Sequence, residues 1–277
     1  MAIENVSQLL SALANNSSRV IIDKASIANM TTGGFASLWR ATGQPAQGAI
    51  PTASAIPTSE TAGSIGFANQ VSPISSYLGW LNANSPNAGT NIEIVDRLAH
   101  MGGLALNSTT PQTITGLNLQ TLGVPAARIG SDDYSDVQWF LEVYADGGAT
   151  ASNATINVTY NDDSSSNLSV VAVGGTLRAS RFIPLTPLIP TAQQGKYIKA
   201  INSVTLSAST TVAGNFGFTA VRPRTSLSVN VANKTETYDW AQLGLPEIAN
   251  DSCLQLIMLC ITTSTGALRG GGKIAHG

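Results

Sequence analysis

Two histidines are present in this 277-residue chain, His100 and His276. A Ser-His-Asp triad would have to use one of them, and no Gly-x-Ser-x-Gly elbow accompanies either. His276 is the penultimate residue, where we expect it to be mobile. His100 follows a predicted strand, where we expect a structural or surface role. The histidines therefore do not indicate an enzyme.

Aspartates gather in two predicted loops. Asp132, Asp133 and Asp136 lie in the first, and Asp162 and Asp163 in the second. A calcium loop needs a fuller set of oxygen ligands at fixed spacing. We therefore expect solvated loops, and whether an ion binds near the first group stays open.

Two glutamates, Glu93 and Glu142, lie within predicted strands. A glycosidase needs a pair of acids, but the period-two alternation of each strand already explains an outward polar side chain. No phosphate-binding loop, dinucleotide fingerprint or Cys/His metal set appears. We expect no enzymatic activity, no cofactor and no metal.

The two cysteines, Cys253 and Cys260, stand seven positions apart in one apolar run. A straight strand would separate them by roughly 23 Å, at about 3.3 Å per residue, which excludes a disulfide within that strand. We expect two buried free thiols.

Composition limits the partners that the chain can have. Apolar residues make up 43% of it, enough for a core, whereas charged residues make up 11% and the net charge is −2. Strong nucleic-acid binding needs many phosphate contacts, and no long basic run supplies them. The longest apolar run, 254–261, is too short to span a bilayer, and no signal peptide is visible. We expect neither nucleic acid nor membrane as a partner.

The first 35 residues predict an arm with one helix. Apolar residues at helical spacing over 3–15 form one face, namely Ile3, Val6, Leu9, Leu10 and Leu13. The alternative is an ordinary helix that packs on the domain.

Residues 41–66 are dense in proline and glycine, which leaves room for few regular elements. We therefore divide the chain into 1–66, a helix with an extended arm, and 67–277, a β-sandwich domain or two packed β subdomains. We expect the first part to contact other subunits, through Ile3, Val6, Leu9, Leu10, Leu13, Trp39, Ile50 and Ile56.

From about residue 77 the pattern is β. Residues 137–144 and 154–160, joined by a turn at 146–148, predict a hairpin. Three further segments, beginning at residues 77, 197 and 253, each read as strand, polar turn and second strand. The fold class is mainly β, an antiparallel β-sandwich or jelly roll with a short N-terminal helix and an extended arm.

Several stretches, taken in order, resemble a loosely defined group of tailed-bacteriophage virion proteins. They are Ser37-Leu-Trp-Arg-Ala-Thr-Gly-Gln-Pro45, Ile94-Val-Asp-Arg-Leu98, Leu141-Glu-Val-Tyr-Ala-Asp-Gly-Gly-Ala-Thr150 and Cys253-Leu-Gln-Leu-Ile257. The resemblance covers most of the chain after residue 36, and it carries no catalytic motif. It implies a protein of the virion, assembled in the bacterial cytoplasm.

Within such a particle, two roles compete. A capsid decoration or cement protein would bind the outside of the head, bridge capsomers and contact the major capsid protein or copies of itself. The alternative is a component of the tail, baseplate or collar. From a different class, a carbohydrate-binding β-sandwich also suits the pattern.

Overall fold

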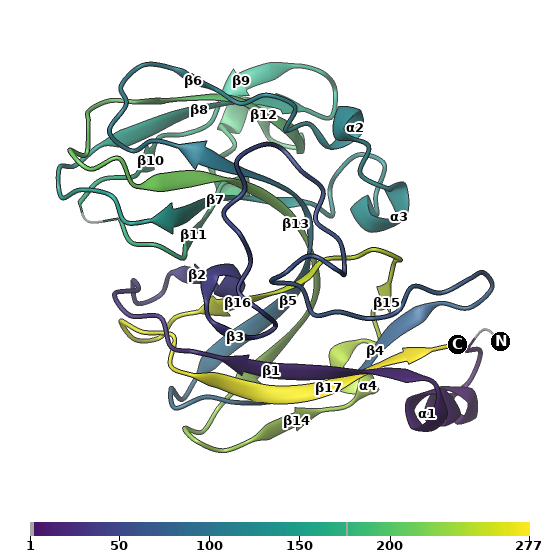
Figure 1. The fold of residues 1–277 in the computed structure, drawn as a ribbon. Coiled ribbons are helices and arrows are strands. Elements are labelled where there is room, and N and C mark those ends of the chain that lie inside the picture. Colours follow the sequence, from purple (N-terminus) through teal and green to yellow (C-terminus); the bar gives the residue numbers. More distant parts are fainter. Residues whose placement is uncertain (1–2, 176) are drawn as a thin grey trace. The chain divides into compact units, whose positions relative to one another are not determined.

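The computed structural model describes residues 3–175 and 177–277. Its fold is mainly β with antiparallel sheets and a short N-terminal helix, which confirms the predicted fold class (Figure 1). The chain forms two compact units. Unit 1 comprises 1–49, 57–96 and 224–277, and unit 2 comprises 50–56 and 97–223.

The helices of the described residues are short. They are α1 (Val6–Asn15), α2 (Leu119–Leu122), α3 (Ala126–Ile129) and α4 (Trp240–Leu243), with 3-10 turns η1 (Leu38–Arg40), η2 (Thr186–Leu188) and η3 (Thr191–Gln193). The strands are β1 (Ser17–Lys24), β2 (Phe35–Ser37), β3 (Gly43–Gln44), β4 (Ser76–Asn84), β5 (Thr90–Leu104), β6 (Gln112–Thr113), β7 (Gln138–Ala145), β8 (Asn153–Tyr160), β9 (Ser165–Asn167), β10 (Val171–Ala172), β11 (Arg181–Pro184), β12 (Ile198–Leu206), β13 (Asn215–Val229), β14 (Glu236–Tyr238), β15 (Glu247–Ile248), β16 (Leu254–Leu259) and β17 (Leu268–His276).

Unit 1 contains two layers of strands. One sheet has the order β14-β4-β17-β1-β3, with β15 also paired to β4. In the other layer, β16 pairs with β2 and with the first half of β5. The core lies between the layers and consists of alternate residues of the facing strands, among them Val20, Ile22, Leu78, Leu81, Ile92, Ile94, Leu256 and Ile274.

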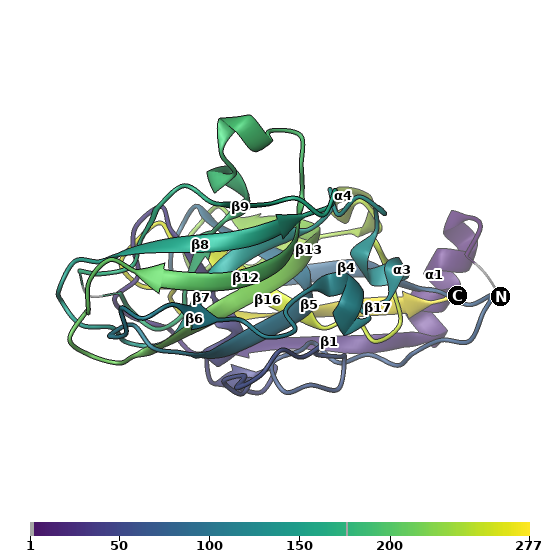
Figure 2. The same cartoon turned by 90° about the horizontal axis from the view of Figure 1, so that it is seen from above.

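Unit 2 repeats this arrangement with other strands. One sheet has the order β10-β8-β12-β6, and Figure 2 shows β8 and β12 side by side. In the other layer, β7 pairs with β11 and β13. Its core includes Trp139, Leu141, Val143, Ile156, Val158, Ile201, Val204, Phe216 and Phe218.

The four predicted hairpins are wrong in their pairing, although their strands exist. β7 and β8, for example, follow one another along the chain, yet β7 pairs with β11 and β13 while β8 pairs with β9, β10 and β12. The same holds for β4 with β5, β12 with β13, and β16 with β17. Each turn carries the chain from one layer to the other, so it closes the sandwich instead of extending a sheet.

The N-terminal segment is divided differently from the boundary predicted at residue 66. Helix α1 begins after Asn5, whose side chain accepts a hydrogen bond from the Gln8 N–H at 3.0 Å. The next eight residues, however, form β1, which lies between β17 and β3 and pairs with β17 along its whole length. Residues 17–24 are therefore an integral strand of unit 1 and not an arm.

Candidate functional site: a buried polar cluster and an open groove

A buried ion pair lies in unit 2. Arg97 of β5 and Glu142 of β7 have fully buried side chains, and Arg97 Nη2 lies 2.7 Å from Glu142 Oε2. The same carboxylate oxygen accepts hydrogen bonds from the Tyr144 hydroxyl at 2.9 Å and from the Thr219 hydroxyl at 2.6 Å. Opposite charge and two hydroxyl donors thus compensate the desolvation of this carboxylate.

The arginine of this pair is held by further contacts. Arg97 Nε donates to His100 Nδ1 at 2.8 Å, and Arg97 Nη2 donates to the Tyr144 hydroxyl at 2.8 Å. Arg128, also buried, donates from Nη2 to the Arg97 carbonyl at 2.9 Å. The cluster is a connected network on three strands and one short helix.

Proton exchange is suppressed in this cluster near neutral pH. Burial, together with the positive Arg97 beside it, lowers the pKa of His100 to about 2. Burial and the negative charge of Glu142 raise the pKa of Tyr144 well above its ordinary value. His100 therefore stays neutral and accepts, while Tyr144 stays protonated and donates, which suits a fixed structural role.

The prediction that Glu142 points outward is wrong. Strand β7 is buried on both faces, with Trp139 and Leu141 on one and Phe140 and Glu142 on the other. The sequence held a signal for this, because the residues of 139–144 other than Glu142 are large and apolar at both parities, as in strands that are covered on both sides. Arg97 was missed as well, because Glu93 and Asp96 in the same strand interrupt the apolar pattern around it.

The other acids considered as catalytic or ion-binding groups are not members of this cluster. Glu93 belongs to unit 1, where partial burial raises its pKa. Asp133 is exposed in a turn, where its carboxylate accepts the Ser135 N–H at 3.0 Å. Asp136 accepts the Ser131 N–H at 3.2 Å and lies 3.4 Å from Arg222. Among the described residues, no group of three or more His, Cys, Asp or Glu side chains is placed to hold a metal ion.

His276 is not mobile, contrary to prediction. It is 4% exposed, and its ring nitrogens lie 2.8 Å from Ser18 Oγ and 2.9 Å from Ser76 Oγ. Strand β17 continues through His276 between β1 and β4, so the end of the chain is part of a sheet. Burial lowers the pKa of His276.

A buried lysine in unit 1 donates hydrogen bonds to backbone carbonyls. Lys24, at the end of β1, is 1% exposed and donates from Nζ to the carbonyls of Ala41 at 3.0 Å and Pro45 at 2.7 Å. Burial lowers its pKa to about 8. These two hydrogen bonds hold the segment that follows η1 against the end of β1.

The cysteine prediction is confirmed. Cys253 and Cys260 are both buried free thiols at opposite ends of β16. Burial raises the pKa of Cys260 to about 11, so the thiolate that redox or metal chemistry requires is disfavoured.

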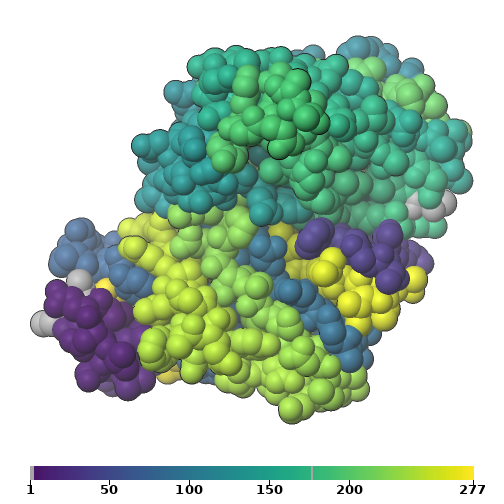
Figure 3. Space-filling model, turned by 180° about the vertical axis from the view of Figure 1, so that it is seen from behind, coloured from purple at the N-terminus to yellow at the C-terminus, as the bar shows by residue number. Residues whose placement is uncertain are grey.

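The predicted interface residues of α1 fall on two sides of the helix. Leu9 is buried against Ala275, with Ile3 and Leu13 partly buried beside it. Val6 and Leu10 remain 49% and 54% exposed. Figure 3 shows this helix, in purple, at the surface of unit 1.

The remaining predicted interface residues are covered to different extents. Trp39 is 1% exposed, and its Nε1–H donates to the Ala49 carbonyl at 2.8 Å. A Cβ on Gly63 would lie 2.6 Å from the Trp39 ring, so glycine is needed there. Ile50 is half-buried, and Ile56 is half-buried against the unit 2 core.

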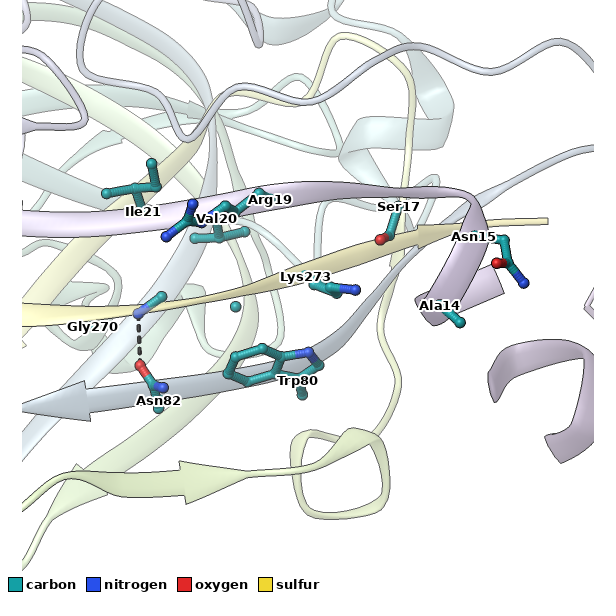
Figure 4. Close-up of a pocket in the computed structure, with 12 residues that line it drawn as sticks. Ala14, Asn15, Ser17, Arg19, Val20, Ile21, Trp80, Asn82, Gly270 and Lys273 are labelled. Atoms are coloured by element: carbon teal, nitrogen blue, oxygen red, sulfur yellow. Dashed lines mark hydrogen bonds between the residues drawn. The ribbon is translucent and has the colours of Figure 1, made fainter. Parts of the chain in front are cut away.

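A groove of about 500 Å³ lies on the outer face of the β4-β17-β1 sheet (Figure 4). At its centre, Gly271 pairs with Asn82 on one side and Ile21 on the other. In the next row, Lys273 pairs with Trp80 and Arg19. The glycine run 270–272 leaves the middle strand without side chains, while the flanking strands keep theirs.

The groove continues across β1 toward β3. A second hollow of about 340 Å³ is lined by β3 and residues 59–66, and it shares Arg19 and Ile21 with the first. The groove thus runs across the strands. This groove was not predicted from the sequence. The signal for it was three glycines inside a strand, which indicate close backbone approach.

No known protein family matches the chain, and no curated protein matches it. Among solved structures, the VP2 subviral particle of infectious bursal disease virus is 11% identical, covering 94% of this chain and 80% of that chain with a TM-score of 0.19. The Gt strain structure of the same virus is 10% identical with the same coverage and a TM-score of 0.15. Similarity at these TM-scores supports no argument about fold or function. No helix of the described residues is long and apolar enough to cross a bilayer.

Proposed function

We propose that this chain is a non-enzymatic structural protein of a tailed-bacteriophage particle, and that it decorates the outside of the head and bridges capsomers. The observation that carries the non-enzymatic part of this proposal is the state of the reactive side chains. Arg97, His100, Glu142 and Tyr144 are buried and bonded to one another, and the pKa shifts of His100 and Tyr144 oppose proton transfer near neutral pH. The assignment to a phage particle rests on the sequence resemblance.

The surface suits association rather than catalysis. Charged residues are 11% of the chain and the net charge is −2, which favours a position away from the packaged genome. Several stretches of the sequence, taken in their order along the chain, resemble tailed-phage virion proteins. This resemblance supports the phage particle as the location of the chain. The proposed partners are the major capsid protein, other virion proteins or further copies of the chain, in a particle assembled in the bacterial cytoplasm.

The proposed contact is narrower than the whole segment 1–66. Leu9, Leu13 and Trp39 pack within unit 1. These side chains therefore do not belong to a free arm. Val6 and Leu10 expose apolar surface on α1, and burying a side chain of this kind is worth about 1.5–3 kcal/mol. We propose that these two residues carry the subunit contact.

Immunogold labelling of intact particles, with antibodies raised against the purified chain, tests this proposal. We expect label on the outside of the head. Label confined to the tail or collar would favour the alternative role, and particles without label would overturn the virion assignment. Hydrolysis of a polysaccharide or ester that is lost on Glu142→Gln, while the variant remains folded, would overturn the non-enzymatic assignment.

A further inference from the structure

The groove on unit 1 has the composition of a ligand site that the structural role does not use. Its lining combines one aromatic ring, Trp80, with the amide of Asn82 and the cations Arg19 and Lys273, and no carboxylate lines its main hollow. Within the described residues, the guanidinium of Arg19 and the indole N–H of Trp80 form no hydrogen bond. The lining is polar and apolar in similar measure, which suits a ligand that itself carries both kinds of surface.

Two hydrogen bonds between side chains and backbone hold the polar groups of the groove in place. The Gly271 N–H donates to Asn82 Oδ1 at 2.7 Å, which orients that amide and leaves its N–H groups as donors. Lys273 Nζ donates to the Leu13 carbonyl at 2.6 Å, so its charge is held at the end of α1. Figure 4 shows Trp80 on β4 beside the glycine run, with Arg19 and Ile21 on β1.

The groove runs across the strands, and this direction limits the class of ligand that it can bind. A peptide that adds to a sheet needs a free strand edge, but β17 is paired on both sides, with β1 and β4. The groove instead crosses the strands and offers side-chain donors and one ring. A ring sugar presents C–H faces to an indole and hydroxyls to amide donors, while a carboxylate or sulfate would pair with Arg19.

We propose that this groove binds an acidic oligosaccharide, with Trp80 as the stacking surface, Asn82 as a hydroxyl partner and Arg19 as the partner of the acidic group. The inference does not depend on the proposed place of the chain in a virion. Its failure would leave the particle labelling result unchanged.

The test is calorimetric titration of the full chain with four probes: an oligogalacturonate, a sulfated heparin-derived oligosaccharide, neutral maltohexaose and hexaglutamate. We expect saturable binding of at least one acidic saccharide, with affinity at least about tenfold above that of maltohexaose and hexaglutamate. The first two probes distinguish a carboxylate from a sulfate ligand. Equal binding of hexaglutamate would reveal a merely cationic surface and overturn the proposal, as would no binding of either acidic sugar.

Variants locate the site. Trp80→Ala and Arg19→Ala should each weaken binding by about tenfold or more. Arg269→Ala is the matched control, because Arg269 lies on the same strand as the glycines, is 70% exposed and does not line the groove. If Trp80→Ala unfolds, Ile21→Ser at the 49% exposed neighbour replaces it. Affinity unchanged by Arg19→Ala, or reduced equally by Arg269→Ala, would overturn the assignment.

Discussion

Each unit contains a buried cation, Lys24 in unit 1 and Arg97 in unit 2, and the two have partners of different kinds. In unit 1, Lys24 donates to two backbone carbonyls. In unit 2, Arg97 faces the carboxylate of Glu142 and the ring of His100. A buried lysine can become neutral by losing its proton, whereas a buried arginine stays charged and needs a counter-charge. We infer that alkaline pH changes the stability of unit 1 through Lys24. Acid pH changes the stability of unit 2 through His100.

The largest expected effect breaks the ion pair of unit 2. Arg97→Met leaves Glu142 buried without its counter-charge, which typically costs about 3–5 kcal/mol. The free energy of unfolding, measured with denaturant, should fall by that amount. Arg178→Met is the control, because its pair with Asp146 is 36% and 51% exposed and should be worth about 1 kcal/mol or less. Equal effects of the two variants would mean that burial does not distinguish these pairs.

A smaller effect should appear at alkaline pH in unit 1. The pKa of Lys24 is lowered to about 8 from 10.5, so between these values the unfolded chain binds more protons and stability rises with pH. At about 1.36 kcal/mol per pKa unit, the gain from pH 8 to pH 10 is about 2 kcal/mol. Thermal or denaturant unfolding of wild type and Lys24→Met should diverge by this amount, and parallel curves would contradict the prediction.

Acid should lower the stability of unit 2, because His100 is protonated more readily in the unfolded chain. Its pKa is about 2 in the folded chain against 6.5 for the free side chain, so stability is lost as the pH falls below 6.5. At pH 5.5 the loss is about 1 kcal/mol, at about 1.36 kcal/mol per unit. His100→Gln should flatten this part of the stability profile. A variant that loses stability with acid as steeply as wild type would show that other groups dominate.

The smallest stability effect is expected on the exposed side of α1. Val6→Ser combined with Leu10→Ser should change the unfolding free energy by less than about 0.5 kcal/mol, because both side chains are about half exposed. If they form a subunit contact, the same variant should associate less in sedimentation velocity or in particle binding. Leu9→Ser is the contrasting variant, since Leu9 is 2% exposed and its loss should destabilise unit 1.

The sequence predicted the strands better than their partners. Alternation locates β8, because Ile156, Val158 and Tyr160 lie on one face, and the structure buries all three. Turn residues after β7 do not reveal whether the chain returns to the same sheet or crosses to the facing one. That choice depends on the packing of distant strands, which local propensity does not encode.

The candidate sites were predictable only in part. The apolar spacing of residues 3–15 predicts helix α1. Which of its apolar side chains are buried depends on Ala275, which lies 263 positions after Ala12 in the sequence. The buried cluster joins residues 97, 142 and 219 through sheet pairing, and no local pattern connects them. The groove arises where glycines of β17 meet Trp80 and Arg19, so it exists only after three separate strands are in register.

The pairing of β1 with β17 sets an order of events during synthesis. Ser17 pairs with Ala275 and Lys24 with Leu268, so β1 has its long partner only after residues 268–275 have left the ribosome. At roughly 5–20 residues per second, this delay is on the order of tens of seconds. Most of unit 2 is the continuous run 97–223, which emerges earlier and can close first. During that interval Val20 and Ile22, which the folded unit buries, lie on a strand that still lacks its β17 partner.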